Sequence, residues 1–319
     1  MLNQLAARKS VATIMRELET GPRLNRVLTA RTLTSIGLGS MIGSGVFVLS
    51  GTVAANHTGP AVTLAFMVAA IGCALAAICY AELAALIPVA GSAYSYTYAT
   101  LGEGVAWFVG WNLALEYMMS AATVAVGWSG YVVNLLEEFG LHLPAALVNA
   151  PVGKNADHAL VTTGAIVNLP AVLIVVALTW LCYIGIRQSA SLNNLMVVIK
   201  VAIIVLFIVV GVSFVDTSLW HPYLPANTGE FGHFGMSGVM QGAAIIYFAY
   251  IGFDTAATTA QEARNPQRDV PAGIMGALVI STILYVAMGA VMTGMVDYTR
   301  LDVAAPVAVA LDEHPSLRW

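Results

Sequence analysis

The 319-residue chain has 59% hydrophobic and only 9% charged residues, and its mean hydropathy is +0.81. Soluble domains have about 25% charged residues, so this composition excludes an ordinary soluble protein and indicates an integral membrane protein. The net charge of −4 and the lack of a basic run give no support for a nucleic-acid partner. Apolar runs of about 20 residues fit membrane-crossing helices, because a barrel strand needs only about ten.

The first 31 residues contain several Arg and Lys side chains but no apolar core, so we predict a cytoplasmic arm without a cleaved signal peptide. Residues 11–18 of this arm are weakly amphipathic, which suits a membrane surface. Crossing alternately from a cytoplasmic start leaves most Arg and Lys inside, as membrane proteins prefer. Seven spans are predicted within a bundle of residues 32–298, at 32–56, 60–88, 102–136, 161–186, 191–215, 238–263 and 271–296.

The two longest connections between spans, residues 137–160 and 216–237, are rich in Pro, Gly, Asn and His. They are interpreted as outer surface loops rather than as a domain. Residues 303–311 have the pattern of a short amphipathic helix. They belong to an outer segment, residues 299–319, that is expected to lead to an eighth span.

The centre of the first span places a polar residue between two glycines, in the order Gly43, Ser44 and Gly45. An unwound helix in hydrocarbon exposes N–H and C=O groups that no water satisfies, so a break there must line a cavity or bind a ligand. For Gly37 and Gly39 a second interpretation stays open, in which small residues let helices pack closely. A dinucleotide fingerprint is excluded because the glycine spacing is wrong and no strand precedes it.

The sixth span has a comparable cluster of aromatic, glycine and carboxylate residues from Phe248 to Asp254. Two discontinuous helices at corresponding positions are typical of secondary transporters, in which helix N-termini face an anion and free carbonyls take a cation. An amino acid carries a carboxylate and an ammonium on one carbon and would satisfy both groups. We therefore predict an amino-acid site between the two breaks.

Two ionisable residues lie deep inside predicted spans. Lys200 is about nine residues into the fifth span, where an unpaired cation costs about 2.5–3.5 kcal/mol, so it should face a polar cavity or lose its proton. The alternative is that its side chain snorkels to the interface. Glu116 in the third span should face the bundle interior, either lining the substrate pocket or pairing with a hydroxyl.

For the remaining polar residues, structural roles are favoured over roles in transport. Asp254 and Glu82 are interpreted as hydrogen-bond anchors, and residues 261–271 are either a gate latch or a solvated connector in which a proline starts the next helix. The six histidines lie in or beside outer loops without metal-ligand spacing, so we predict no metal site and no cofactor. Without a P-loop or nucleophile motif, an ATP-driven pump and an enzyme are both disfavoured.

Four motifs together resemble the amino acid–polyamine–organocation (APC) superfamily, specifically its bacterial cationic-amino-acid-transporter-like branch. They are residues 42–49, residues 116–131, the helix around Lys200, and residues 248–271. The resemblance runs from about residue 31 to the end. It implies an all-α polytopic membrane protein with a leucine-transporter-like fold, built from two inverted five-helix repeats with broken first and sixth helices. It also implies about five further spans and insertion in the plasma (inner) membrane.

The resemblance also assigns roles to individual residues. Lys200 matches a lysine at the place where sodium-coupled relatives bind sodium, so protons and not sodium are expected as the coupling ion, in agreement with charge repulsion. Glu116 matches a carboxylate of the side-chain pocket. The carboxylate of the substrate is assigned to the backbone of Met41, Ser44 and Gly45, and its ammonium to the carbonyls of Phe248, Ala249 and Ile251.

These observations predict a secondary active amino acid transporter that imports its substrate together with protons by alternating access. An amino acid exchanger would share every site residue, and a truncated, non-transporting membrane protein would still bind the amino acid. The expected partners are the amino acid and the lipid bilayer. A small single-helix membrane partner, the oligomeric state and the identity of the amino acid stay open.

Overall fold

The computed structural model describes residues 7–20, 26–154, 160–184, 186–314 and 316. Its helices are α2 Val11–Thr20, α3 Ala30–Met41, η1 Gly45–Leu49, α4 Ser50–Val53, η2 Ala54–Thr58, η3 Gly59–Ala61, α5 Val62–Leu86, α6 Ser92–Thr100, α7 Glu103–Glu138, η4 Ala145–Leu147, α8 Leu169–Ile184, α9 Ile186–Gly211, η5 Val212–Phe214, η6 Thr217–Trp220, α10 Gly235–Ile246, η7 Tyr247–Tyr250, α11 Thr255–Thr258, η8 Ala260–Glu262, α12 Pro266–Met295, η9 Tyr298–Arg300 and α13 Pro306–Asp312. The two strands, β1 Val152–Lys154 and β2 Leu160–Thr162, pair antiparallel.

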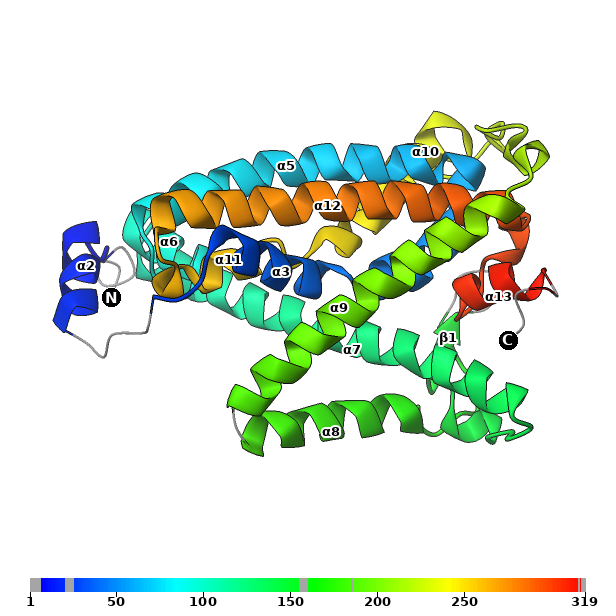
Figure 1. The fold of residues 1–319 in the computed structure, drawn as a ribbon, viewed down its shortest axis with the longest axis horizontal. Helices are drawn as coiled ribbons and strands as arrows, with labels where there is room; N and C mark the ends of the chain where they lie inside the picture. The colour runs from blue at the N-terminus through cyan, green and yellow to red at the C-terminus, as the bar shows by residue number, and fades with distance from the viewer. Residues whose placement is uncertain (1–6, 21–25, 155–159, 185, 315, 317–319) are drawn as a thin grey trace.

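The long helices form an elongated bundle (Figure 1). Helices α5 and α12 lie side by side along its length, with α3 and α10 packed against them, while α9 crosses the bundle diagonally to reach α8. We call the end that holds α2 and α6 the inner end, and the end that holds α13 the outer end. The described part contains five helices long and apolar enough to cross a membrane, and α8 is a shorter apolar helix. The prediction of an all-α polytopic membrane protein is confirmed.

Several predicted boundaries differ from the structure. The fourth span was expected from residue 161, but residues 160–162 form strand β2 and the helix begins at Leu169. The cause is a polar cap, since Asn168 Oδ1 accepts both the Ala171 N–H at 3.1 Å and the hydroxyl of buried Ser129 at 2.6 Å. The predicted loop 137–160 therefore contains strand β1, the first strand of a small hairpin.

The seventh span also begins earlier than expected. Helix α12 starts at Pro266 rather than Pro271, because proline is well suited to a first helical position and the Asn265 N–H is capped by Asp269 Oδ2 at 3.0 Å. Of the two interpretations of residues 261–271, this favours the connector. Helix α6 was not predicted, whereas the short helix expected at 303–311 is present as α13.

The N-terminal arm is joined to the bundle by backbone hydrogen bonds. The Leu28 N–H donates to the Glu262 carbonyl at 2.9 Å, and the Arg264 N–H donates to the Leu28 carbonyl at 2.8 Å. This short parallel bridge ties the start of the first span to the end of the sixth. The inner ends of the two spans are thereby held next to each other.

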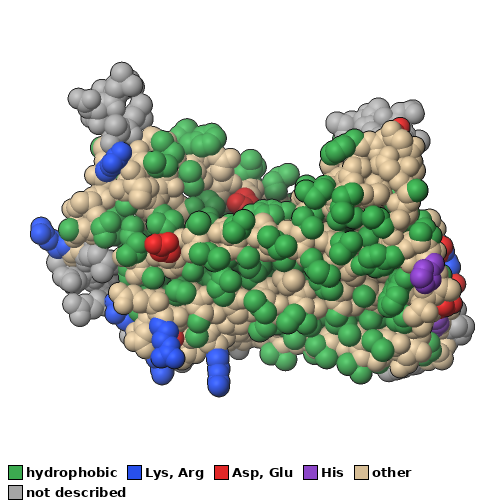
Figure 2. Space-filling view, turned by 90° about the horizontal axis from the view of Figure 1, so that it is seen from above, with side chains coloured by type: hydrophobic (Ala, Val, Ile, Leu, Met, Phe, Trp, Pro, Cys, Tyr) green, Lys and Arg blue, Asp and Glu red, His purple; other side chains and the backbone are tan. Residues whose placement is uncertain are grey.

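Side-chain charge differs between the two ends of the bundle. Figure 2 shows Lys and Arg side chains gathered at the inner end, a broad hydrophobic surface along the middle, and histidine at the outer end. This distribution matches a multi-pass membrane protein whose apolar middle lies in the hydrocarbon and whose ends lie in water.

Candidate functional site

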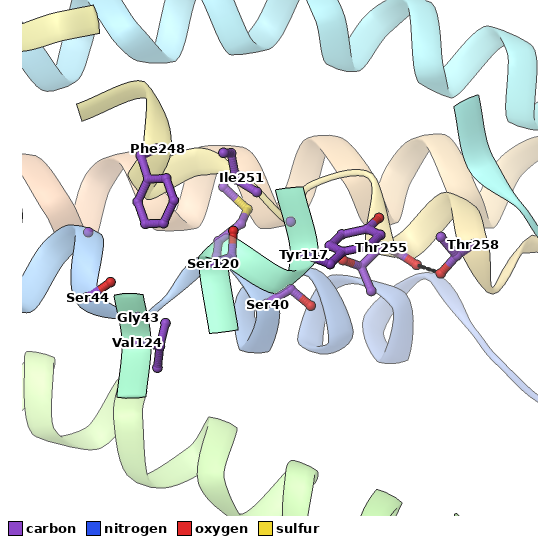
Figure 3. A pocket seen from close by; sticks show the side chains of 13 residues that line it. Ser40, Gly43, Ser44, Tyr117, Ser120, Val124, Phe248, Ile251, Thr255 and Thr258 are labelled. Atoms are coloured by element: carbon purple, nitrogen blue, oxygen red, sulfur yellow. Dashed lines mark hydrogen bonds between the residues drawn. The ribbon is translucent and has the colours of Figure 1, made fainter. Parts of the chain in front are cut away.

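A cavity of about 350 Å³ lies where the two broken spans meet helix α7 (Figure 3). It has the size of a small-molecule site. Its walls come from the break in the first span, from the break in the sixth and from the middle of α7. The lining residues are Ser40, Met41, Gly43, Ser44, Gly45, Tyr117, Ser120, Val124, Phe248, Ile251, Gly252, Thr255 and Thr258.

The first span breaks because of its glycines and a close approach of the sixth. Helix α3 ends at Met41, and the outer half of the span resumes at Gly45 in a π-helical turn. A Cβ atom on Gly45 would lie 2.4 Å from Ala249 Cα, so only glycine allows the two broken spans to touch here. Ser44 lies at the N-cap position of the outer half without a capping hydrogen bond; the residue is only 6% exposed, and its hydroxyl has no hydrogen-bond partner. An unpaired buried hydroxyl on a cavity wall points to a ligand.

The sixth span breaks at a turn after η7. Gly252 has φ +108°, which glycine adopts without strain, and a Cβ there would lie 2.7 Å from Ser40 Cβ. The turn carries Phe248 and Ile251 to one side of the cavity and Thr255 to the other. Both breaks thus depend on a glycine packed against the opposite span.

Helix α7 supplies the third wall through Tyr117, Ser120 and Val124, which sequence reasoning did not single out. Their spacing of three and four residues puts them on one helical face, so this periodicity is the signal that could have found them. The Ser120 hydroxyl is buried without a partner, like that of Ser44. The Tyr117 hydroxyl donates to Asp254 Oδ2 at 2.8 Å, which fixes α7 to the sixth span.

Asp254 has the anchoring contacts that the sequence predicted for it. It is buried and also lies 3.4 Å from the Ser92 hydroxyl at the start of α6. Glu82, in contrast, is exposed on α5. Only the first of these two acidic residues therefore ties elements together.

Lys200 lies beside the first break. Its ammonium donates to the Gly39 carbonyl at 3.1 Å, in the last turn of α3. The last carbonyls of a helix lack intrahelical partners and carry partial negative charge, so a cation is stabilised there. Lys200 thus makes a specific contact between α9 and α3.

The predicted substrate-binding residues are only partly brought together. Met41, Ser44, Gly45, Phe248 and Ile251 line the cavity. The other two predicted residues, Ala249 and Glu116, do not line it.

Ala249 lies behind the cavity wall against Gly45, and its carbonyl accepts the Tyr285 hydroxyl at 3.1 Å. Glu116 is half-buried on α7, one turn before Ser120, but it is not among the residues that line the cavity. Among the described residues there is no group of three His, Cys, Asp or Glu placed to hold a metal ion.

Comparison with known proteins gives consistent matches. A family model described as amino acid permease matches residues 28–308. The methylthioribose transporter of Bacillus subtilis is 46% identical over 90% of this chain and 59% of its own length. The branched-chain amino acid permease BcaP of the same bacterium is 42% identical, over 98% and 64%. The vacuolar cationic amino acid transporter 4 of Arabidopsis thaliana is 39% identical, over 100% and 51%.

The chain thus spans roughly half to two-thirds of the length of these relatives. All three are named as transporters or permeases and not as enzymes, and the family model covers most of the chain. The resemblance to the APC superfamily inferred from the four motifs is confirmed. The chain belongs to the amino acid permease family.

Proposed function

We propose that this chain forms the substrate-binding part of a secondary active transporter that moves an amino acid across the plasma (inner) membrane by alternating access. The observation that carries the proposal is the meeting of two broken spans at one cavity, with the unpartnered hydroxyl of Ser44 between them. We further propose that the two breaks occupy equivalent positions in inverted five-helix repeats. The basic inner end would then be cytoplasmic.

The electrostatics of the two breaks suit an amino acid. The outer half of the first span begins at Gly45, and the first N–H groups of a helix favour an anion such as a carboxylate. Helix α10 and η7 end at Tyr250, so their last carbonyls favour a cation such as an ammonium. One molecule carrying both groups on one carbon bridges the breaks.

Lys200 supports proton coupling in place of sodium coupling. Its ammonium already occupies the carbonyl end of α3 through Gly39. A second cation at that end would be repelled, which disfavours sodium beside the first break. A lysine that releases its proton would free the Gly39 carbonyl and loosen the contact between α9 and α3, so protonation and helix movement are linked.

The cavity wall favours a substrate with an uncharged side chain. Its described lining combines hydroxyls with apolar groups and includes no Asp, Glu, Lys or Arg. A charged substrate side chain would lose its hydration there without gaining an ionic partner. The relatives are named for methylthioribose, branched-chain and cationic substrates, so family membership by itself does not choose among these classes.

A thermal-shift panel tests this assignment. The purified protein is heated with each of the twenty amino acids and, separately, with methylthioribose. We expect Tm to rise with neutral amino acids of moderate size, because a ligand that binds only the folded state stabilises it. If no amino acid raises Tm, the assignment of an amino-acid site is wrong. If only methylthioribose raises Tm, the substrate belongs to that sugar class instead.

Exchange is separated from symport by uptake into liposomes. An exchanger takes up labelled amino acid only when the liposomes are preloaded with amino acid. A symporter accumulates it in empty liposomes when a proton gradient points inward. We expect the second behaviour.

We predict that Ser44→Ala weakens amino-acid binding about tenfold. The hydroxyl has no protein partner to lose, so its removal acts on the ligand contact, which is worth about 1–1.5 kcal/mol. Isothermal titration measures the change in Kd. Ser95→Ala is the control, because this partly buried serine on α6 lies outside the cavity and its hydroxyl donates to the Ala90 carbonyl; it should bind like wild type. Equal affinity in Ser44→Ala and wild type would remove this hydroxyl from the site.

A further inference from the structure

Two histidines face each other at the outer end of the bundle, away from the cavity. His57 lies in η2, at the outer end of the first span, and His233 lies two residues before α10 begins. Their ring centroids are 5.7 Å apart. The pair therefore sits at the junction of the outer halves of both broken spans.

Hydrogen bonds around His57 join these two outer halves. Its Nδ1 lies 2.7 Å from the Gly232 carbonyl, and because a carbonyl only accepts, Nδ1 carries the hydrogen. The Phe234 N–H donates to the His57 carbonyl at 2.9 Å. Gly238 packs so tightly on the same carbonyl that a Cβ there would lie 2.0 Å from the oxygen. We call the group His57, Gly232, His233 and Phe234 the outer staple.

The charged groups around the outer staple are few. Glu230, on the same loop as His233, has its carboxylate 3.8 Å from His233 Nε2. From η9, Tyr298 contacts the Phe234 ring edge to face with ring centroids 5.9 Å apart, and Asp297 directly precedes Tyr298 in the chain. Arg300 on η9 pairs with Glu313. One adjacent carboxylate thus balances one imidazolium but not two.

We propose that the outer staple is a pH-sensitive switch that joins the outer halves of the two broken spans tightly at neutral pH and more weakly in acid. Imidazole side chains gain their proton between pH 5 and 8. With Nδ1 of His57 already donating to Gly232, the second proton enters at Nε2 and places a positive ring against His233. When both rings are charged, their repulsion opposes the contact that holds Phe234 to His57. This device works whichever solute the cavity binds, so it goes beyond the proposed function.

Hydrogen exchange at the Phe234 amide tests the switch, because this N–H is bonded to the His57 carbonyl. The protein in lipid nanodiscs is labelled at pH 5.0 and pH 7.5, and protection factors are corrected for the intrinsic pH dependence of exchange. Two unit charges at 5.7 Å in a water-like medium change an equilibrium constant about threefold. We expect Phe234 protection in the wild type to fall at least about threefold on acidification.

His57→Asn is the informative variant, because its amide nitrogen takes the position of the imidazole Nδ1 and can donate to the Gly232 carbonyl but cannot become charged. We expect Phe234 protection in this variant to be the same at both pH values, and His233→Gln should behave alike. His142→Gln, an exposed histidine after α7, is the matched control and should keep the wild-type pH response. A wild-type protection factor that does not change with pH, or an equal acid response in all three variants, would overturn the switch.

Discussion

Gly45→Ala is expected to abolish amino-acid binding. The added Cβ would lie 2.4 Å from both Ala249 Cα and Ala249 Cβ, and the neighbour on one side is backbone that cannot turn away. Carbon atoms pack at about 3.5–4.0 Å, so the two broken spans must separate by roughly 1 Å or more. Separation moves the N–H groups after Ser44 away from the carbonyls of η7. A ligand that bridges both breaks then loses its contacts with one of them.

The same substitution should lower stability by about 1–3 kcal/mol, the usual effect of overpacking. Ligand-dependent Tm shifts measure the binding, and the Tm without ligand measures the stability. Gly72→Ala is the matched control, since a Cβ at Gly72, in the middle of α5, meets nothing within 4 Å. A Gly45→Ala protein that still shows the full ligand-dependent Tm shift would show that close contact of the two spans is not required for binding.

Lys200→Met should uncouple uptake from the proton gradient. Methionine keeps the length and apolar stem of the side chain but cannot carry a proton or donate to the Gly39 carbonyl. Substrate binding should persist, because Lys200 does not line the cavity. Uptake by liposomes reconstituted with the protein is measured with and without an inward proton gradient. We expect the gradient to raise uptake severalfold in wild type and to have no effect in Lys200→Met.

Lys200→Arg is the control for charge, because a guanidinium can donate to the Gly39 carbonyl but stays protonated in proteins. It should therefore bind substrate and lack gradient-driven uptake. The methionine variant should fold well, since an apolar side chain in α9 has no cost of burial in the membrane. An equal dependence on the gradient in wild type and Lys200→Met would remove the lysine from coupling while leaving the substrate site intact.

Some parts of the site were readable from single residues. Gly43, Ser44 and Gly45 predict a break because two glycines and a hydroxyl cannot continue an apolar span at low cost. The break in the sixth span could likewise be predicted from Gly252 and Asp254. Both signals are local, since they reside in the backbone freedom and polarity of a few consecutive residues.

Other parts of the site could not be predicted from the sequence, because they depend on contacts between distant residues. Tyr117 and Glu116 are neighbours in sequence, and both are polar residues in an apolar helix. Which of them faces the cavity depends on the rotation of α7, and that rotation is set by contacts with distant residues such as Asp254. Tyr117 lines the cavity and Glu116 does not, and the role of Glu116 in the side-chain pocket stays a prediction.

Taken alone, the sequence determined that the chain is helical and membrane-embedded, that its first and sixth spans are broken, and that a lysine lies deep in the fifth. These properties follow from hydrophobicity, span length and glycine placement, which act along a single segment. The tertiary structure alone decided that Gly45 touches Ala249, that Lys200 reaches Gly39, and that His57 meets His233. Such contacts join residues far apart in the chain, and they depend on how whole helices pack against one another.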